Sequence, residues 1–341
     1  MRDEENPAIG FHRVQCESLE GPQAVRPVVI EEAVRTILTC NKSPDIPFAW
    51  SVNPYRGCTH GCAYCYARRT HEYLDWGAGT DFECKLVVKV NAAERLREAF
   101  NRRGWRREQV AFSGVTDCYQ PLEAKYRLTR RCLEVCLEYA NPVGVVTKST
   151  LVTRDVDLLV ELQRRRSASV LFSIALADAG RARVLEPGAP SPEQRFRAMR
   201  YLRDAGVEVG LMVAPVIPGL NDRDIPALLA RGAEAGASHA CCSPVRLPGT
   251  VADVFLGRLR RDFPDAAERV EARVRELRGG RLNNPEIGRR MEVGGAYWES
   301  VQRLFETTAT RLGLSGGQRW REASPVLDRP GPKQLALFET G

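Results

Sequence analysis

The chain has 341 residues, enough for one large domain or two ordinary ones, and its 43% apolar and 27% charged residues exclude a disordered chain or a fibrous repeat. The formal net charge is +7, from 50 Lys+Arg against 43 Asp+Glu, which is compatible with a nucleic-acid partner but does not select one. The first ten residues are polar and no apolar run approaches the roughly 20 residues that span a membrane, so we expect a cytoplasmic protein whose eleven cysteines are free of disulfides.

The order of apolar and amphipathic segments predicts an α/β protein. Residues 1–45 contain several prolines and little periodicity, and we expect an N-terminal extension with one short helix at 31–38. From residue 46 to 285, short apolar runs alternate with amphipathic stretches, as in repeated βα units around a mainly parallel sheet. The expected strands are 48–52, 85–90, 109–113, 143–147, 169–175, 207–215 and 237–244, and the expected helices are 68–74, 92–101, 128–139, 156–165, 192–205 and 224–235.

The number of these units favours a barrel over a doubly wound sheet. Six or seven βα repeats within about 240 residues suit a partial (β/α)6 barrel, in which the chemistry gathers at the C-terminal ends of the strands. After the strands, 251–278 is predicted to be helical with a break at Phe263-Pro264, and 297–312 to be a further amphipathic helix. Residues 286–341 are therefore expected to form a C-terminal helix and a flexible tail.

A loop with three cysteines is the strongest chemical signal in the chain. Cys58, Cys62 and Cys65 lie after an expected strand and before an expected helix, and Gly57 and Gly61 permit a tight backbone between them. Three thiolates can each bind one iron of a cubane cluster and leave the fourth iron without a protein ligand, unlike electron-transfer clusters held by four cysteines. An open iron is a site for a small molecule, so these cysteines are the candidate metal ligands.

Two other interpretations of the cysteines stay open. A zinc ion could be bound by the same loop with His60, His71 or Cys84 as a further ligand, although no second pair of closely spaced cysteines follows. The three cysteines could also be unrelated core residues, although regular spacing between loop glycines is not typical of a core.

Five segments together resemble a known family. The spacing of Cys58, Cys62 and Cys65, with Tyr64 just before the third cysteine, is similar to the signature of the radical S-adenosylmethionine (SAM) superfamily. More narrowly, residues 46–290 resemble the spore photoproduct lyase-like branch, in the segments NPYRGCTHGCAYCYAR, SGVTDCYQPLE, TKS, EPGAPSPEQR and APVIPGLND.

The resemblance implies two cofactors, a [4Fe-4S] cluster and SAM, which the open iron chelates through its amino and carboxylate groups. An electron, supplied by a donor such as flavodoxin or ferredoxin, then cleaves SAM to methionine and a 5′-deoxyadenosyl radical that abstracts hydrogen from a substrate. The cofactors carry this chemistry, and the protein supplies orientation and protection. The substrate itself cannot be derived from the resemblance.

The resemblance also suggests which strand ends contact SAM. Ser113, Gly114, Thr116 and Asp117 end one expected strand and are candidates for its amino group, although Thr and Asp also cap turns. Further candidates are Lys148 and Ser149 for the carboxylate, Ser173 and Arg195 on later elements, and Val216 for the adenine. Ser149 could instead cap a helix, and an arginine on a helix is usually solvated.

Cys118 is a candidate hydrogen-atom donor. Spore photoproduct lyases use a cysteine in this part of the fold, although their cysteine would stand a few residues earlier, where Gly114 and Val115 lie here. Cys132 and Cys136 are four residues apart on an expected helix, which predicts two buried core thiols.

Several arginine clusters keep nucleic acid open as a partner. They lie at 102–107, 164–166, 258–261 and 289–290, and arginines with an interleaved aromatic can bind a nucleic-acid backbone. Neighbouring acidic residues such as Glu108 and Glu161 are equally consistent with solvated faces. The predicted function is a radical SAM enzyme, with a nucleic-acid lyase or repair enzyme and a non-catalytic iron–sulfur or zinc module as alternatives.

Overall fold

The computed structural model describes residues 6–7 and 26–316. In chain order the elements are β1 (Val28–Glu32), β2 (Leu38–Cys40), β3 (Trp50–Val52), β4 (Tyr55–Arg56), η1 (Tyr66–Leu74), α1 (Thr80–Cys84), β5 (Lys85–Lys89), α2 (Ala92–Phe100), β6 (Val110–Phe112), α3 (Leu122–Tyr126), α4 (Leu128–Glu138), β7 (Val143–Thr147), η2 (Thr150–Asp155), α5 (Val156–Arg165), β8 (Ala168–Ser173), α6 (Ala179–Leu185), α7 (Pro192–Asp204), β9 (Glu208–Val216), η3 (Asp222–Asp224), α8 (Ile225–Glu234), β10 (His239–Pro244), α9 (Val251–Asp262), α10 (Pro264–Leu277), α11 (Ala296–Arg311) and β11 (Ser315–Gly316).

The main sheet has eight strands in the order β11-β10-β9-β8-β7-β6-β3-β2. Its neighbours from β3 to β11 pair in parallel, and β2 pairs antiparallel with β3 at one edge. The six strands β3 and β6 to β10 follow one another in chain order, and β2 and β11 lie at opposite edges, so the sheet does not close. This confirms the predicted partial (β/α)6 barrel.

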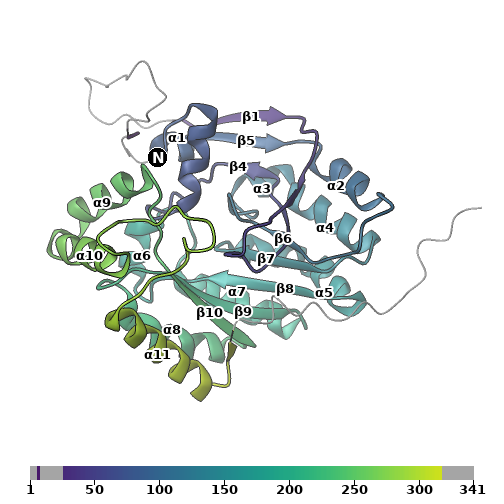
Figure 1. Cartoon of the computed structure of the whole chain (residues 1–341). Helices are drawn as coiled ribbons and strands as arrows, with labels where there is room; N and C mark the ends of the chain where they lie inside the picture. Colours follow the sequence, from purple (N-terminus) through teal and green to yellow (C-terminus); the bar gives the residue numbers. More distant parts are fainter. Residues whose placement is uncertain (1–5, 8–25, 317–341) are drawn as a thin grey trace, which may run out of the picture.

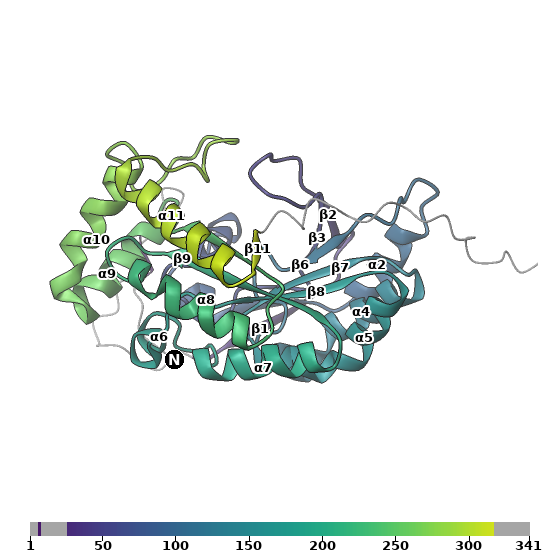
Figure 2. The ribbon, with the colours of Figure 1, turned by 90° about the horizontal axis from the view of Figure 1, so that it is seen from below.

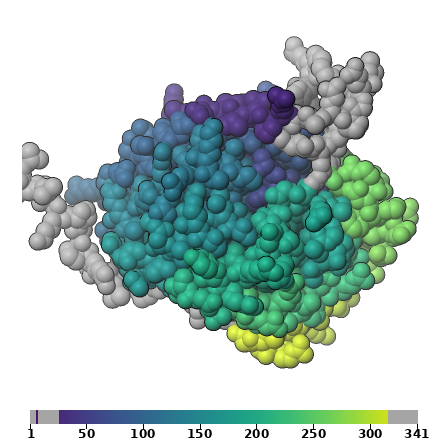
Figure 3. All heavy atoms as spheres, turned by 180° about the vertical axis from the view of Figure 1, so that it is seen from behind, coloured from purple at the N-terminus to yellow at the C-terminus, as the bar shows by residue number. Residues whose placement is uncertain are grey.

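Helices cover the outer face of this sheet. In Figure 2, α4, α5, α7 and α8 run along one side of the strands, and in Figure 3 atoms from the middle of the chain, coloured teal, cover much of the back of the molecule. The loops of residues 41–49 and 279–295 project on the other side (Figure 2). Because each helix returns the chain to the start of the next parallel strand, all these strands end at one edge.

Local sequence explains why α7 begins where it does. Ser191 accepts a hydrogen bond from the Gln194 main chain at 3.3 Å, and the Gln194 side chain accepts one from Ser191 N at 2.8 Å. Pro192, whose ring fixes a helical φ, occupies the first turn. This capping box fixes the helix start and thereby the position of Arg195 one turn later.

Two predictions about the first hundred residues are wrong. The helix expected at 31–38 is replaced by β1 and β2, because Val28–Glu32 pairs in parallel with Lys85–Lys89 along its whole length. The strand expected at 85–90 exists as β5, but it belongs to a separate sheet of order β1-β5-β4 and not to the barrel. Figure 1 shows this small sheet at the top, beside α1 and apart from β8 to β10.

The C-terminal helices follow the sequence closely. The predicted break at Phe263-Pro264 separates α9 from α10, since Pro264 begins the second helix and cannot continue the first. Helix α11 occupies the segment expected at 297–312, and the tail from residue 317 lies outside the described residues. None of the helices in residues 26–316 is long and apolar enough to cross a membrane.

Candidate active site

The cysteine loop lies across the C-terminal ends of three barrel strands. Thr116 and Gln120, which follow β6, donate hydrogen bonds to Gly57 O at 2.6 and 3.0 Å. After β7, the Lys148 ammonium lies 5.7 Å from the centre of the Tyr64 ring. After β8, Leu185 O accepts a hydrogen bond from Ala63 N at 2.9 Å. The loop is therefore at the edge where a barrel places its chemistry.

Glycines let the loop approach its neighbours closely. Gly57 and Gly61 have φ values of +78° and +61°, which side chains rarely adopt. A Cβ on Gly61 would lie 2.8 Å from Glu83 Oε2, and a Cβ on Gly57 would lie 2.9 Å from Lys85 O. The glycines flanking the first two cysteines thus serve the close packing that the sequence predicts.

The buried side chain of Arg68 binds the main chain of the cysteine loop, a role that no sequence signal indicated. Its side chain is fully buried, its Nε donates to Cys62 O at 2.9 Å and its Nη1 donates to Ala78 O at 2.9 Å. Its remaining nitrogen forms an ion pair with Glu83. From the sequence alone, a single arginine in an expected helix gives no sign of whether its side chain is buried or solvated.

A second close approach comes from Gly188, in the turn between α6 and α7. Gly188 N donates to His60 O at 2.9 Å, and a Cβ on Gly188 would overlap Thr59 O and lie 3.0 Å from His60 Cα. Because these are main-chain atoms of the cysteine loop, the clash cannot be relieved by moving a side chain.

Gly188→Ala is therefore expected to displace the cysteine loop. We expect less iron bound after reconstitution and a free energy of unfolding lower by about 1–3 kcal/mol, measured by iron analysis and denaturant titration. Gly257→Ala on α9 is the control, because its added methyl group meets nothing within 4 Å. Equal iron content in the two variants would contradict the predicted contact.

A buried polar network joins the loop to β8 and α7. The Tyr64 hydroxyl and the Arg195 guanidinium both bind Glu186, and Arg195 Nη1 also donates to Ser173 O at 2.9 Å. Lys148 Nζ donates to Ser173 Oγ at 3.0 Å. Four of the predicted site residues, Tyr64, Lys148, Ser173 and Arg195, are therefore in one connected cluster.

Glu186 is the member of this network that the sequence analysis did not single out. Burial opposes its charge, but Arg195 and then Lys148 hold the pKa of Glu186 below its usual range. The one sequence feature that could have indicated Glu186 is its position as the first residue of the segment EPGAPSPEQR. Arg195 has only 1% of its surface exposed, so the reading of a solvated helix arginine does not apply.

Asp117 connects the end of β7 to the cysteine loop. Its carboxylate accepts from Thr147 Oγ1 and from Lys148 N, both at 2.7 Å, and its Oδ2 lies 3.4 Å from His60 Nδ1. Burial raises the pKa of Asp117, but the bond and charge of His60 and the other donors lower it to about 2. The carboxylate is therefore ionised and already hydrogen-bonded within the protein.

The other predicted contact residues lie at the same edge. Ser113 Oγ donates to Val146 O at 2.6 Å, and Gly114 O accepts from the Tyr66 hydroxyl at 2.7 Å. Ser149 Oγ accepts from Leu151 N at 3.2 Å, so Ser149 caps η2 as the alternative reading expected. Val216 ends β9 and is buried.

Cys118 lies in the main hydrophobic core and is fully buried. Burial raises the pKa of its thiol well above the usual range. Its proposed role as a hydrogen-atom donor remains a prediction. Cys132 and Cys136 are buried in the same core, as expected from their spacing on α4.

The three loop cysteines suit a shared, positively charged group. Burial raises the pKa of Cys62 well above its usual range, and the neighbouring Cys65 and Cys58 raise it further, whereas Lys148 opposes them. Burial also raises the pKa of Cys65, while the charge and hydrogen bond of His60 outweigh burial at Cys58 and lower its pKa. The Cys62 and Cys65 thiols, which resist ionisation alone, become thiolates when a metal centre compensates their charge.

His71, one of the zinc ligands considered above, has another structural role. Its side chain is fully buried and its Nε2 lies 2.9 Å from Lys85 O, where it joins η1 to β5. Within residues 6–7 and 26–316, no three His, Cys, Asp or Glu side chains converge closely enough to hold a single metal ion.

Burial lowers the pKa of His71 from 6.5 to about 4. Because only the unfolded chain takes up a proton near pH 6.5, the stability from neutral His71 is present above that pH and is lost as the pH falls toward 4. Between pH 7 and pH 5 the wild type is expected to lose about 2 kcal/mol more than His71→Gln, measured by denaturant titration. Equal losses would contradict the assignment.

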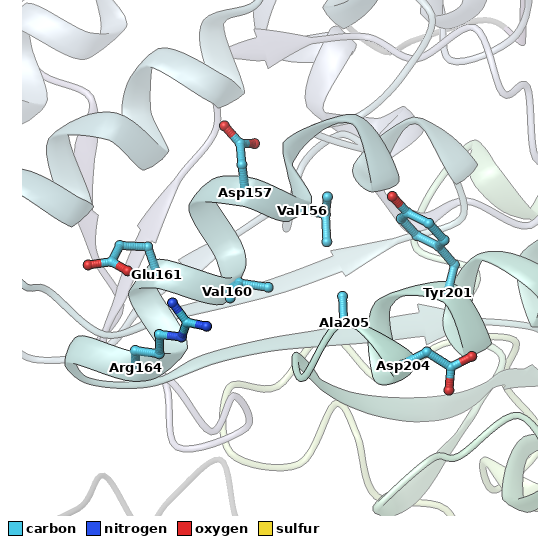
Figure 4. Close-up of a pocket in the computed structure, with 8 residues that line it drawn as sticks. All are labelled: Val156, Asp157, Val160, Glu161, Arg164, Tyr201, Asp204 and Ala205. Atoms are coloured by element: carbon cyan, nitrogen blue, oxygen red, sulfur yellow. The ribbon is translucent and has the colours of Figure 1, made fainter.

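A surface hollow of the structure lies away from this site. A cavity of about 480 Å³ lies between α5 and α7 on the outer helical face, and Val160, Arg164 and Tyr201 are among its lining residues (Figure 4). None of the predicted site residues lines it. We therefore place the candidate site at the strand ends and not in this hollow.

Comparison with known proteins identifies the family of this chain. Residues 52–231 match the family model described as "Radical SAM superfamily". The chain belongs to the radical SAM superfamily. This family uses a [4Fe-4S] cluster and SAM, which are accordingly the cofactors of this chain.

The sequence is also similar to those of several individual proteins. An uncharacterized protein of Mycobacterium tuberculosis is 37% identical over 274 residues, which cover 79% of this chain and 74% of that protein. A protein of Pseudomonas phage M6 named "Radical SAM Nalpha-GlyT isomerase" is 27% identical, over 77% of this chain and 52% of its own length. The phage protein, whose name states a reaction, is therefore less similar to this chain than the mycobacterial protein.

The fold is similar to that of spore photoproduct lyase. A structure of that enzyme complexed with dinucleoside spore photoproduct matches with a TM-score of 0.61 and 16% identity, over 84% of this chain and 80% of the other. At this identity the likeness establishes the radical SAM fold and not the substrate.

Proposed function

We propose that this chain is a radical SAM enzyme whose Cys58, Cys62 and Cys65 bind the [4Fe-4S] cluster. The carrying observation is the position of these cysteines: one glycine-bounded loop brings all three to the C-terminal edge of the barrel, where it is fixed by contacts from β6, β7 and β8. When bound, the reduced cluster cleaves SAM and so supplies a 5′-deoxyadenosyl radical that abstracts hydrogen from the substrate.

The chain's own residues bind and orient SAM beside this loop. Lys148 provides a positive charge for the carboxylate of SAM. Burial lowers the pKa of Lys148, but the charges of Cys62 and Glu186 outweigh burial and raise this pKa above its usual range. Ser173 supplies a hydroxyl already aligned by Lys148 at 3.0 Å and by Ala214 O at 3.1 Å. The cation therefore remains charged where the ligand needs it.

Other strand ends complete the binding surface. Ser113, Gly114, Thr116 and Asp117 would hold the amino group of SAM, and Val216 at the end of β9 would contact the adenine. Asp117 contributes its negative charge to this surface, and it also positions Thr147 and Lys148 through the hydrogen bonds that it accepts from them. Tyr64 and Arg195 act as positioning residues, because their bonds to Glu186 fix the loop against α7.

Two reaction partners remain to be supplied from outside. A flavodoxin or ferredoxin is the proposed electron donor, since the site itself offers one cluster. For the substrate, a nucleic-acid component is the second candidate; a lyase that shares only the fold of this chain was solved in complex with a dinucleoside photoproduct. Cys118 would serve as the hydrogen donor only if the core opens around its buried thiol.

Formation of 5′-deoxyadenosine is the decisive experiment. Protein reconstituted anaerobically with iron and sulfide, then reduced by dithionite with SAM present, is expected to release 5′-deoxyadenosine, detected by chromatography. Lys148→Met is expected to reduce this release at least tenfold by weakening SAM binding, whereas Lys125→Met on α3 is the control. A cluster-loaded wild type that releases no 5′-deoxyadenosine would refute the proposal.

A further inference from the structure

Three arginines from the C-terminal part of the chain gather beside the cysteine loop. Arg246 follows β10, Arg278 follows α10, and Arg290 lies in the segment before α11. The Arg246 guanidinium is 5.6 Å from the centre of the ring of Tyr66, the residue directly after Cys65. Arg278 joins the others, since its Nη1 donates to Arg290 O at 3.2 Å and its Nη2 to the carbonyl just before Arg246 at 2.9 Å.

This arginine cluster, Arg246, Arg278 and Arg290, carries more positive charge than its surroundings neutralise. Within the part of the chain that the structure describes, Asp45 is the carboxylate that pairs with it, at 2.8 Å from Arg290 Nε. Arg246 forms no ion pair there, and the charge of Asp45 acts on it from further away. Its buried Nε has no hydrogen-bond partner, and its Nη1 faces the weakly accepting Met291 sulfur at 3.5 Å.

The positive charges of this cluster lower the pKa of neighbouring arginines. Burial and then Arg290 lower the pKa of Arg246, and burial and then Arg246 lower the pKa of Arg278 to about 10. The three guanidinium groups lie close together and repel one another. A bound oxyanion would reverse this unfavourable energy and satisfy the free donor of Arg246.

We propose that the arginine cluster binds a phosphate group of the substrate. Guanidinium groups present paired N–H donors that match phosphate oxygens, and three of them exceed what one small carboxylate requires. The inference rests on the proposed function, because the cluster lies at the same edge of the barrel as the cysteine loop: Tyr66, which Arg246 faces, is hydrogen-bonded to Gly114 at the end of β6.

The position of Tyr66 supports this orientation. About half of its side-chain surface is exposed, 48%, although it borders both the cysteine loop and Arg246. A substrate held by its phosphate at the arginine cluster would therefore pass over an accessible aromatic ring toward the SAM site. Aromatic rings beside arginines are well suited to stacking with a base or another planar group.

Phosphate binding to the cluster-loaded, unreduced protein with SAM present tests the inference. Inorganic phosphate is titrated by ³¹P NMR line broadening against the wild type, Arg246→Gln and Arg164→Gln, the last of which alters the outer hollow. We expect phosphate to bind at least tenfold more weakly to Arg246→Gln and equally to the wild type and Arg164→Gln. If Arg246→Gln does not fold, Arg246→Lys is expected to weaken binding because it loses the paired donors.

Competition identifies the source of the phosphate. If the substrate is a strand, a short oligothymidylate displaces phosphate and loses affinity in Arg246→Gln; if it is a small molecule, thymidine 5′-monophosphate does so and the oligomer does not. The inference would be overturned if the wild type bound no phosphate, or if Arg246→Gln bound it as tightly as the wild type. It would also be overturned if Arg246→Gln weakened SAM binding and left phosphate binding unchanged. Release of 5′-deoxyadenosine by the same wild-type sample separately decides the proposed function.

Discussion

Replacing any one of Cys58, Cys62 and Cys65 by alanine is expected to abolish the iron–sulfur cluster. All three thiols lie in one loop whose main chain is fixed by Thr116 and by Arg68, so each variant removes one ligand from a site whose backbone is held in place. The reconstituted variants should contain little iron and lack the visible absorption of the cluster, and 5′-deoxyadenosine release should fall to background.

Cys136→Ala is the matched control for this result. Cys136 is also a buried thiol, but it lies on α4 in the main core, away from the loop. Its variant should bind as much iron as the wild type and lose only the stability of a small packing defect. An unchanged iron content in any of the three loop variants would remove that cysteine from the proposed ligand set.

Arg195→Met is expected to lower the free energy of unfolding by about 3–5 kcal/mol. The variant leaves Glu186 buried and charged without the guanidinium that compensates it, and it removes the donor to Ser173 O. The lost compensation raises the pKa of Glu186, so the destabilisation should diminish at low pH as the carboxyl protonates. Denaturant titration at two pH values measures both effects.

Two further variants separate a buried ion pair from a general helix effect. Arg197→Met changes the neighbouring arginine of α7, which pairs with Glu193 at 3.3 Å on the exposed face, and should cost less than about 1 kcal/mol. Glu186→Gln combined with Arg195→Met should recover part of the loss, because the uncompensated charge is gone. A double variant no more stable than Arg195→Met would show that packing, and not charge, dominates.

The barrel and the position of the three-cysteine loop could be predicted because their signals are local. Alternating βα segments are encoded in stretches of five to fifteen residues, and the actual strands β6 to β10 lie within or near their expected ranges. The cysteines are likewise close in sequence, so their spacing alone fixes their proximity. Pro264 and the capping box of α7 fix helix ends by the same local chemistry.

The small sheet and the contacts around the loop depended on distant residues. Residues 28–32 form a strand because β5, more than 50 residues later, provides hydrogen-bond partners, and no local pattern records that pairing. Similarly, Glu186 becomes the partner of Tyr64 only when the turn after α6 returns to the barrel mouth, 122 residues along the chain.

The sequence by itself determined the partial barrel, the three-cysteine loop and the family to which the motifs point, since each depends on spacing within a short segment. Only the tertiary structure decided that Arg68 and Arg195 are buried ion-pair residues and not solvated ones, and that Arg246, Arg278 and Arg290 meet beside Tyr66. The physical reason is that the environment of an arginine is set by the partners that folding brings to it, and these partners come from other strands and helices.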